Sequence, residues 1–231
     1  MSKLALLGGE SITNRKEHPI PQVDLSDLLS VISCFEKGKF TGFRAGCYDG
    51  GEYVVEFEKL LSEQHGTRYA AAFDTWSNGL VACLMSLGIE AEDEVIITPY
   101  TMSSCATSIL TCGAIPVFAD VCEDSGNIDP EDIERKITSK TKAIFVVHLF
   151  GIPANMKKIM EIAKKHNLYV LEDCAQAPLA VVDGKLCGTI GDVGGFSLTE
   201  SKHVMSGEGG IAITNNEKIN NGLRIIRNHG E

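Results

Sequence analysis

The sequence predicts an α/β fold with a mostly parallel central sheet and helices on both faces of that sheet. Two observations support this prediction. Several short runs, such as the Val-Ile-Ile of residues 95–97, are continuously β-branched, which is typical of strands covered on both faces. Longer segments with apolar residues at helical spacing alternate with these runs, and such alternation indicates parallel crossovers. The 231 residues are enough for one large domain or two small ones.

Seven segments are expected to form strands. They are residues 69–73, 94–98, 115–119, 142–149, 169–172, 195–198 and 210–214. A glycine-rich stretch at residues 207–210 separates the last two, and it indicates an antiparallel strand or a reversal in the sheet. Residues 1–50 are expected to form an irregular N-terminal segment around one helix near 24–37, and residues 51–231 a large domain.

Four helices are expected between the strands. They cover residues 78–87, 103–111, 131–137 and 155–166. Pro130 suits the first turn of the third helix, because proline has a helical φ and an amide hydrogen is not needed there. Lysines near the end of the fourth helix agree with the helix dipole. These helices would supply the crossovers that a parallel sheet requires.

Composition and patterning exclude several classes of protein. The net charge of -10 leaves no basic footprint, so no nucleic-acid binding is expected. No apolar stretch is long enough for a membrane span or a signal peptide, so a cytoplasmic protein without membrane contact is expected. The eight cysteines occur singly, without a CxxC pair or zinc spacing, which predicts reduced thiols and no metal site.

A lysine in an unusual place is the strongest local signal. Lys202 follows Phe-Ser-Leu-Thr-Glu-Ser at residues 196–201 and precedes Gly-Glu-Gly-Gly at residues 207–210. A glycine-rich turn between two strands is an odd place for a solvated charge, which favours a functional lysine. The alternative is an ordinary surface lysine in a loop.

Two further segments carry polar groups at the ends of expected strands. Asp173 follows the strand 169–172, at the end where α/β sheets bind their ligands; alternatively, it caps the next turn. Residues 74–79, Asp-Thr-Trp-Ser-Asn-Gly, lie between a strand and a helix, where hydroxyls and backbone amides suit a phosphate. The alternative for this segment is an ordinary helix cap.

These three signals fit one chemistry. An aldehyde cofactor such as pyridoxal 5'-phosphate needs an amine for its Schiff base, a role that suits Lys202. It needs a carboxylate that keeps its ring nitrogen protonated, a role that suits Asp173. It also needs a phosphate cradle, which residues 75–78 and Ser197 could form. The convergence of the three signals predicts a pyridoxal-phosphate site.

An ordered set of short motifs runs from about Leu6 to the end of the chain. The motifs are Leu-Gly-Ile at 87–89, Asp-Glu-Val-Ile at 93–96, Thr-Pro at 98–99, Pro-Val-Phe-Ala-Asp at 116–120, Asn-Ile-Asp-Pro at 127–130, Thr-Lys-Ala-Ile at 141–144, His-Leu-Phe-Gly at 148–151 and Arg-Asn-His-Gly at 227–230. Their order and spacing resemble the DegT/DnrJ family of nucleotide-sugar aminotransferases, a branch of the fold-type I pyridoxal-phosphate enzymes. The resemblance implies that residues 51–231 are the cofactor-binding large domain of that fold.

The resemblance also implies a role for each site residue. Lys202 would carry the cofactor and Asp173 would pair with its ring nitrogen, and both are the expected catalytic residues. Gln176 would hydrogen-bond the ring hydroxyl oxygen. Contacts with the phosphate are expected from Ser197, Thr75, Trp76 and Ser77.

The chain departs from the family pattern at three positions. Trp76 stands where the family usually has the glycine of Ser-Gly-Thr. Met102 stands where an aromatic residue often stacks on the cofactor ring; Met102 is expected to bind the cofactor, with Tyr100 or Trp76 as candidates for the stacking. Pro178 replaces a histidine present in many members, which bears on the substrate.

The resemblance implies amino transfer to a keto sugar carried on a nucleotide, with glutamate or glutamine as the donor, by a homodimer. Family members continue into a small C-terminal domain, so the 231 residues are expected to be a fragment or a truncated form. Two alternatives remain open. One is a sugar dehydratase of the same cofactor class, which Lys202 disfavours because those enzymes typically have histidine at this position. The other is a non-catalytic cofactor-binding or regulatory module.

Overall fold

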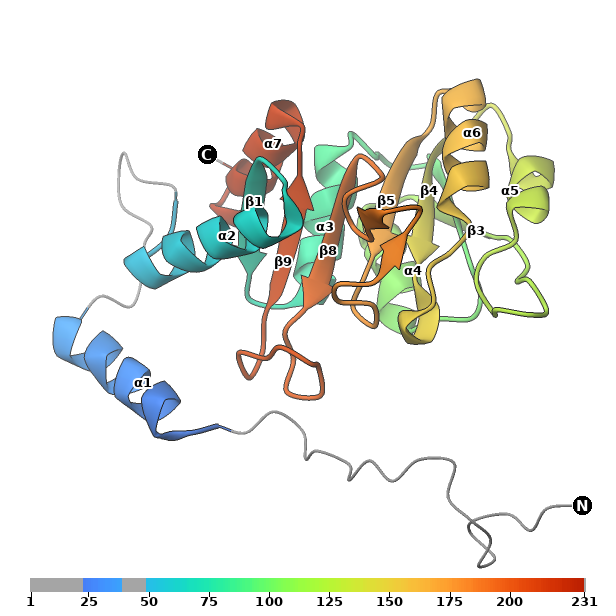
Figure 1. The fold of residues 1–231 in the computed structure, drawn as a ribbon. Coiled ribbons are helices and arrows are strands. Elements are labelled where there is room, and N and C mark those ends of the chain that lie inside the picture. The colour runs from blue at the N-terminus through green and yellow to red at the C-terminus, as the bar shows by residue number, and fades with distance from the viewer. Residues whose placement is uncertain (1–22, 39–48, 231) are drawn as a thin grey trace, which may run out of the picture.

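A computed structural model describes residues 23–38 and 49–230 of the chain. Within these residues, a seven-stranded sheet has the strand order β1-β9-β8-β5-β4-β2-β3 (Figure 1). The strands are β1 Tyr69–Phe73, β2 Glu94–Ile97, β3 Ile115–Phe118, β4 Thr141–Val147, β5 Tyr169–Asp173, β8 Val193–Ser197 and β9 Gly210–Thr214. Among these described strands β9 alone is reversed. It pairs antiparallel with β1 and β8, and all the other pairs in the sheet are parallel. The mostly parallel sheet and the reversal at its last strand are therefore confirmed.

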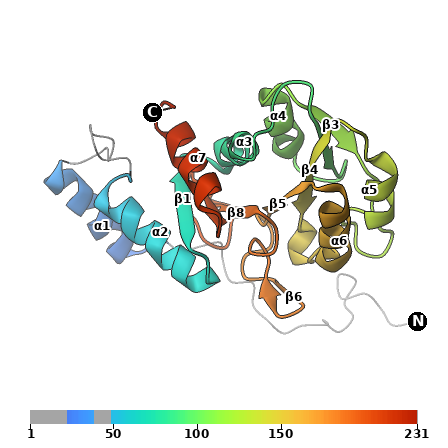
Figure 2. The ribbon, with the colours of Figure 1, turned by 90° about the horizontal axis from the view of Figure 1, so that it is seen from above.

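Helices cover both faces of the sheet, as predicted (Figure 2). One face carries α3 Trp76–Ser86, α4 Ser103–Thr111 and α7 Glu217–Arg227, and the other carries α2 Glu52–His65, α5 Pro130–Lys136 and α6 Met156–His166. A further helix, α1 Leu25–Lys37, lies beside the start of α2 (Figure 1). No helix among the described residues is long and apolar enough to cross a membrane.

The β-branched run in β2 shows why the sheet is buried on both sides. Ile97 belongs to the core beneath α3 and α4, whereas its neighbour Ile96 belongs to the core beneath α5 and α6. Neither side chain is exposed to solvent. Successive residues of a strand point to opposite faces, so an uninterrupted apolar run is required where both faces are covered.

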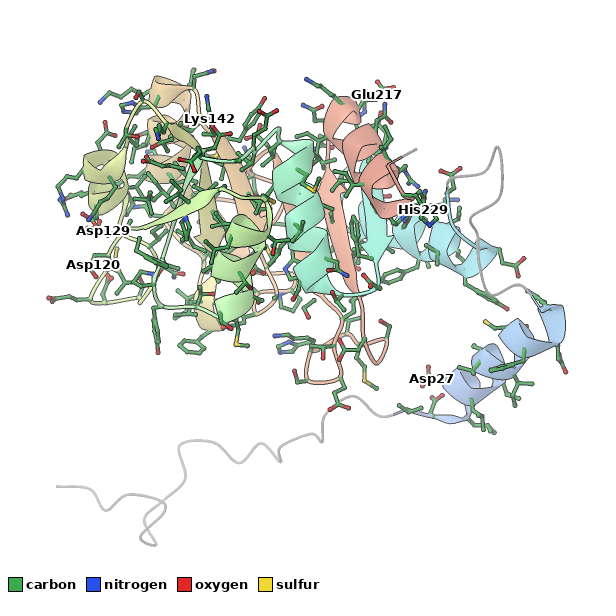
Figure 3. The ribbon with its side chains drawn as sticks, turned by 180° about the vertical axis from the view of Figure 1, so that it is seen from behind. Asp27, Asp120, Asp129, Lys142, Glu217 and His229 are labelled. Carbon is green, nitrogen blue, oxygen red and sulfur yellow. The ribbon has the colours of Figure 1, made fainter. Side chains whose placement is uncertain are left out.

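Polar side chains begin the helices that follow these strands. Asp129 is the N-cap of α5 and accepts a hydrogen bond from the Glu131 amide at 2.9 Å, with Pro130 in the first turn. The Asp129 amide also donates to the Asp120 carbonyl at 2.8 Å, so the two residues lie side by side beyond β3 (Figure 3). These contacts fix where the chain turns from the edge of the sheet into α5.

Several predicted boundaries are wrong by a few residues. The strand predicted at 142–149 ends at Val147, because a short 3₁₀ turn, Leu149–Gly151, follows. β5 continues through Asp173, which is the last residue of the strand and does not follow it. β8 begins at Val193 because that residue already pairs with β5. The helix predicted from residue 78 begins at Trp76, because Thr75 is its N-cap.

The sequence prediction missed α2, α7 and a small hairpin formed by β6 Val181–Val182 and β7 Lys185–Leu186. An ion-pair network joins the two missed helices. Glu58 of α2 is buried and accepts hydrogen bonds from Arg224 and Arg227 of α7 at 3.0 and 2.6 Å. The same guanidinium groups donate to backbone carbonyls of β1, so the network ties α2, α7 and β1 together. Of the predicted N-terminal segment, residues 1–22 and 39–48 lie outside the described residues.

Candidate active site

The carboxyl ends of β5 and β8 bring the main predicted residues to one edge of the sheet. Asp173 is the last residue of β5 and Ser197 the last residue of β8. The two strands are parallel and adjacent, with Asp173 in register with Gly195. Their carboxyl ends therefore meet at the same edge, where α/β sheets bind their ligands.

Asp173 is only 3% exposed and is held by three hydrogen-bond donors. Its Oδ1 accepts from the Trp76 indole Nε1 at 3.0 Å and from the Ala175 amide at 2.9 Å. Its Oδ2 accepts from the Cys105 thiol at 3.3 Å. Burial, together with the nearby charge of Asp173, raises the pKa of Cys105, so this sulfur keeps its proton and can donate. A carboxylate offers about four acceptor positions, so Oδ2 retains one for a further donor.

Gln176 has a fixed amide. Its Oε1 accepts the Phe150 backbone amide at 2.7 Å. Since a backbone N–H can only donate, the amide oxygen faces Phe150 and the NH2 group remains available for another acceptor. This orientation suits the predicted hydrogen bond from Gln176 to a ring oxygen.

Lys202 lies in the loop between β8 and β9, which projects below the sheet in Figure 1. Backbone hydrogen bonds organise this loop: Lys202 donates to the Thr199 carbonyl at 2.9 Å, and Leu198 donates to the Gly209 carbonyl at 2.9 Å. The residue is half-buried. A half-buried lysine in a hydrogen-bonded loop differs from the ordinary surface lysine considered as the alternative.

One cleft of about 490 Å³ brings three of the predicted residues together. Gln176, Ser197 and Lys202 all line it, together with Ala175, whose amide binds Asp173. The other lining residues are mostly apolar and include Phe150, Pro178, Leu179 and Val204. Apolar walls with a few convergent polar groups are typical of a small-molecule site.

The remaining predicted residues lie at the N-termini of α3 and α4. Thr75 Oγ1 accepts the Asn78 amide at 3.1 Å, so the ordinary cap considered for this segment is present. Ser77 is exposed in the first turn, where helix amides have no partner within the helix. Met102 is 62% exposed at the start of α4. None of these three residues lines the cleft in the part of the chain that the structure describes.

The two candidates for ring stacking differ in their surroundings. Tyr100 is half-exposed and packs edge-on against Phe150, with ring centroids 6.1 Å apart. Trp76 is buried, and its indole is directed to Asp173. Of the two candidates, Tyr100 is therefore the one that packs against the cleft-lining Phe150.

Sequence reasoning assigned no role to Glu172, the neighbour of Asp173. Its side chain is completely buried. The two oxygens accept hydrogen bonds from three backbone amides, those of Gly188, Ile190 and Gly191, at 2.6–2.9 Å. A fourth donor is His148 Nε2 at 3.0 Å; the Ala154 amide donates to His148 Nδ1, which leaves the imidazole proton on Nε2. Glu172 thereby fixes the loop before β8. An acid inside a buried strand was the signal for it.

Replacing Glu172 by glutamine is expected to destabilise the fold by about 3 kcal/mol, because an amide NH2 would face backbone donors and leave buried groups unpaired. For a chain of this size the melting temperature should fall by roughly 6–12 °C. Glu161→Gln, on the exposed side of α6, is the matched control. Thermal unfolding followed by circular dichroism measures both variants, and equal melting temperatures would refute the structural role of Glu172.

The sheet order, the reversed β9 and the lysine loop before it define the large domain of a fold-type I pyridoxal-phosphate enzyme. The chain belongs to the DegT/DnrJ/EryC1/StrS aminotransferase family, whose model matches residues 41–231. This finding confirms the family predicted from the sequence, and with it the pyridoxal-phosphate cofactor class.

Three relatives show the extent of the similarity. GDP-perosamine synthase of Escherichia coli O157:H7 is 42% identical over 172 residues, which cover 73% of this chain and 46% of the synthase. The structure of an aminotransferase from Psychrobacter cryohalolentis matches with a TM-score of 0.83 and 38% identity, covering 89% of this chain and 51% of that one. E. coli GDP-4-keto-6-deoxy-D-mannose-3-dehydratase with bound hydrated PLP matches with a TM-score of 0.82 and 28% identity, covering 91% and 54%. The chain spans about half the length of the curated relatives it matches.

Proposed function

We propose that this chain is the cofactor-bearing part of a pyridoxal-phosphate-dependent aminotransferase that acts on a nucleotide-linked keto sugar, with glutamate or glutamine as the amino donor. One observation carries the proposal: Lys202, Gln176 and Ser197 line a single cleft together with Ala175, whose amide binds the buried carboxylate of Asp173. When bound, the cofactor supplies an aldehyde for an amine and an electron-poor ring. The acceptor position left on Asp173 Oδ2 and the free NH2 group of Gln176 fit the polar groups of that ring.

Each residue has a defined task in this proposal. Lys202 provides the amine that attaches the cofactor and then moves protons at the reacting carbon. Asp173 holds a proton on the ring nitrogen, because a nearby negative charge favours the protonated form. Gln176 donates to the ring oxygen. Ser197 and the first turn of α3, with Thr75, Trp76 and Ser77, bind the phosphate at the positive end of the helix. Met102 and Tyr100 cover the open face of the ring.

The substrate class rests on the relatives. One of them is named a GDP-perosamine synthase and another a dehydratase of a GDP-linked keto sugar, so a GDP-linked 4-keto-6-deoxy sugar is the first substrate to test. Lys202 favours amino transfer over dehydration, because its amine can attach the cofactor and move the protons that amino transfer requires. In this proposal residues 51–231 are the cofactor-binding domain, residues 1–50 an N-terminal segment, and a small C-terminal domain outside these residues completes the substrate site. The assembly is a cytoplasmic homodimer.

The test compares these 231 residues with a form extended to the length of the relatives. Substrate must be held against the reactive amine, and an error of about 1 Å can lower a rate by about 10²-fold. We therefore expect cofactor binding by both forms, but substantial amino transfer only by the longer one. Production of 2-oxoglutarate from glutamate in the presence of the keto sugar measures the transfer. A longer form that binds the cofactor but releases the sugar without an amino group would contradict the proposed reaction.

A further inference from the structure

The single tryptophan of the chain, Trp76, occupies an unusual place for a residue at the start of a helix. It is the first residue of α3, yet it is only 5% exposed. Its indole Nε1 donates to Asp173 Oδ1 at 3.0 Å.

Glycines on two neighbouring elements make room for the indole. A Cβ on Gly195 of β8 would lie 2.2 Å from Trp76 Cη2, and a Cβ on Gly79 of α3 would lie 2.6 Å from Cε3. Real Cβ atoms do not approach other atoms this closely, so any larger residue would displace the ring. The packing of α3 on β8 is therefore fitted to Trp76, and it determines where the indole N–H is directed.

The indole N–H of Trp76 is one of three donors that hold the Asp173 carboxylate. Trp76 and the Ala175 amide use both acceptor positions of Oδ1, whereas the Cys105 thiol uses one position of Oδ2. Hydrogen bonds to a carboxylate favour its charged form, and an unpaired carboxylate in this buried place would be costly. The donors on Oδ1 also fix the rotation of the carboxylate, and one acceptor position of Oδ2 has no donor among the described residues.

We propose that Trp76 is a positioning residue for Asp173: its indole N–H holds the carboxylate turned so that Oδ2 accepts a hydrogen bond from the protonated ring nitrogen of the cofactor. This inference rests on the proposed function. It assigns the Trp76 indole a task different from the ring stacking expected from the sequence, because the indole N–H is already bound to Asp173. The proposed phosphate contact of Trp76 is left to its backbone amide.

Trp76→Phe tests the inference, because phenylalanine keeps an aromatic ring at this position and removes the N–H donor together with one ring of the indole. We expect the variant to fold and to bind pyridoxal phosphate about 10-fold more weakly, the effect of losing one hydrogen bond to a charged group. The visible absorption of the bound cofactor, which is sensitive to charge and hydrogen bonding around its ring, should also shift. Dissociation constants come from absorbance titration of the 231-residue chain, and circular dichroism confirms the fold.

Gly79→Ala provides a second variant that does not alter Trp76 itself. The added methyl group must push the indole away from its place, so the same loss of cofactor affinity and the same spectral shift are expected. Gly222→Ala is the matched control: Gly222 is also a closely packed helix glycine, but it lies on α7, against Ser86. This control should leave the affinity and the spectrum unchanged.

The outcomes separate this inference from the proposed function. If the wild-type chain binds the cofactor while Trp76→Phe binds it equally well, or more tightly, the positioning role is wrong. Tighter binding would show that the indole blocks the ring nitrogen. If the wild-type chain binds no cofactor, the proposed function fails and the inference fails with it. Weaker binding and a spectral shift in both Trp76→Phe and Gly79→Ala would support it.

Discussion

Replacing Lys202 by alanine should abolish covalent attachment of pyridoxal phosphate and lower amino transfer by about 10³-fold or more, since the nucleophile and the proton-transfer group are lost together. The fold should survive, because Lys202 lies half-buried in a loop outside the sheet. Lys202→Arg should be equally inactive: a guanidinium keeps the positive charge but does not lose its proton to form a Schiff base. The visible absorption band of the bound cofactor and the rate of transfer measure the effect.

Lys142→Ala is the control for this experiment. Lys142 is exposed near the amino end of β4, at the opposite end of the sheet from the lysine loop (Figure 3). Its removal should change neither the absorption band nor the rate. Retention of the band in Lys202→Ala would show that another lysine carries the cofactor.

Asp173→Asn should allow covalent attachment of the cofactor but lower amino transfer by about 10²–10⁴-fold. Asparagine has the shape of aspartate, so its carbonyl oxygen can still accept from Trp76 and Ala175. It has no negative charge, so the ring nitrogen would lose its proton more readily and the ring would withdraw electrons less well. Single-turnover kinetics of the longer form with glutamate measure this loss.

Asp183→Asn is the matched control for Asp173→Asn. Asp183 lies in the turn between β6 and β7 at a φ of 50°, a conformation that asparagine adopts as readily as aspartate. We expect full activity from this control. A normal rate in Asp173→Asn would remove the carboxylate from the reaction and would leave it a structural role beside Trp76.

The strands could be predicted from the sequence because both faces of the sheet are buried. A continuous run such as that of Ile96 and Ile97 has no other stable place in a soluble protein. The helix α2 was missed although Phe57 and Leu61 pack on the core at helical spacing, because its fully buried side chains are the polar Glu58 and His65. Glu58 is buried only because Arg224 and Arg227 approach it from α7, which no local pattern reveals.

The residues of the candidate site could be predicted from the sequence, but the contacts among them could not. Lys202 and Ser197 follow from short motifs at strand ends, Gln176 follows from the family resemblance, and the structure brings all three to one cleft. The contacts of Asp173 with Trp76 and Cys105 join β5 to α3 and α4, which are distant in sequence. They depend on how these helices pack on one face of the sheet. Spacing along the chain therefore gave no indication that Trp76 would reach the carboxylate.

The location of the covalently bound cofactor tests the central claim most directly. The purified wild-type chain is mixed with pyridoxal phosphate, reduced with borohydride and digested, and the labelled peptide is sequenced by mass spectrometry. We predict a single labelled lysine, Lys202, in the peptide that connects β8 to β9. A label on any other lysine, or no label at all, would contradict the assignment of this cleft as the cofactor site.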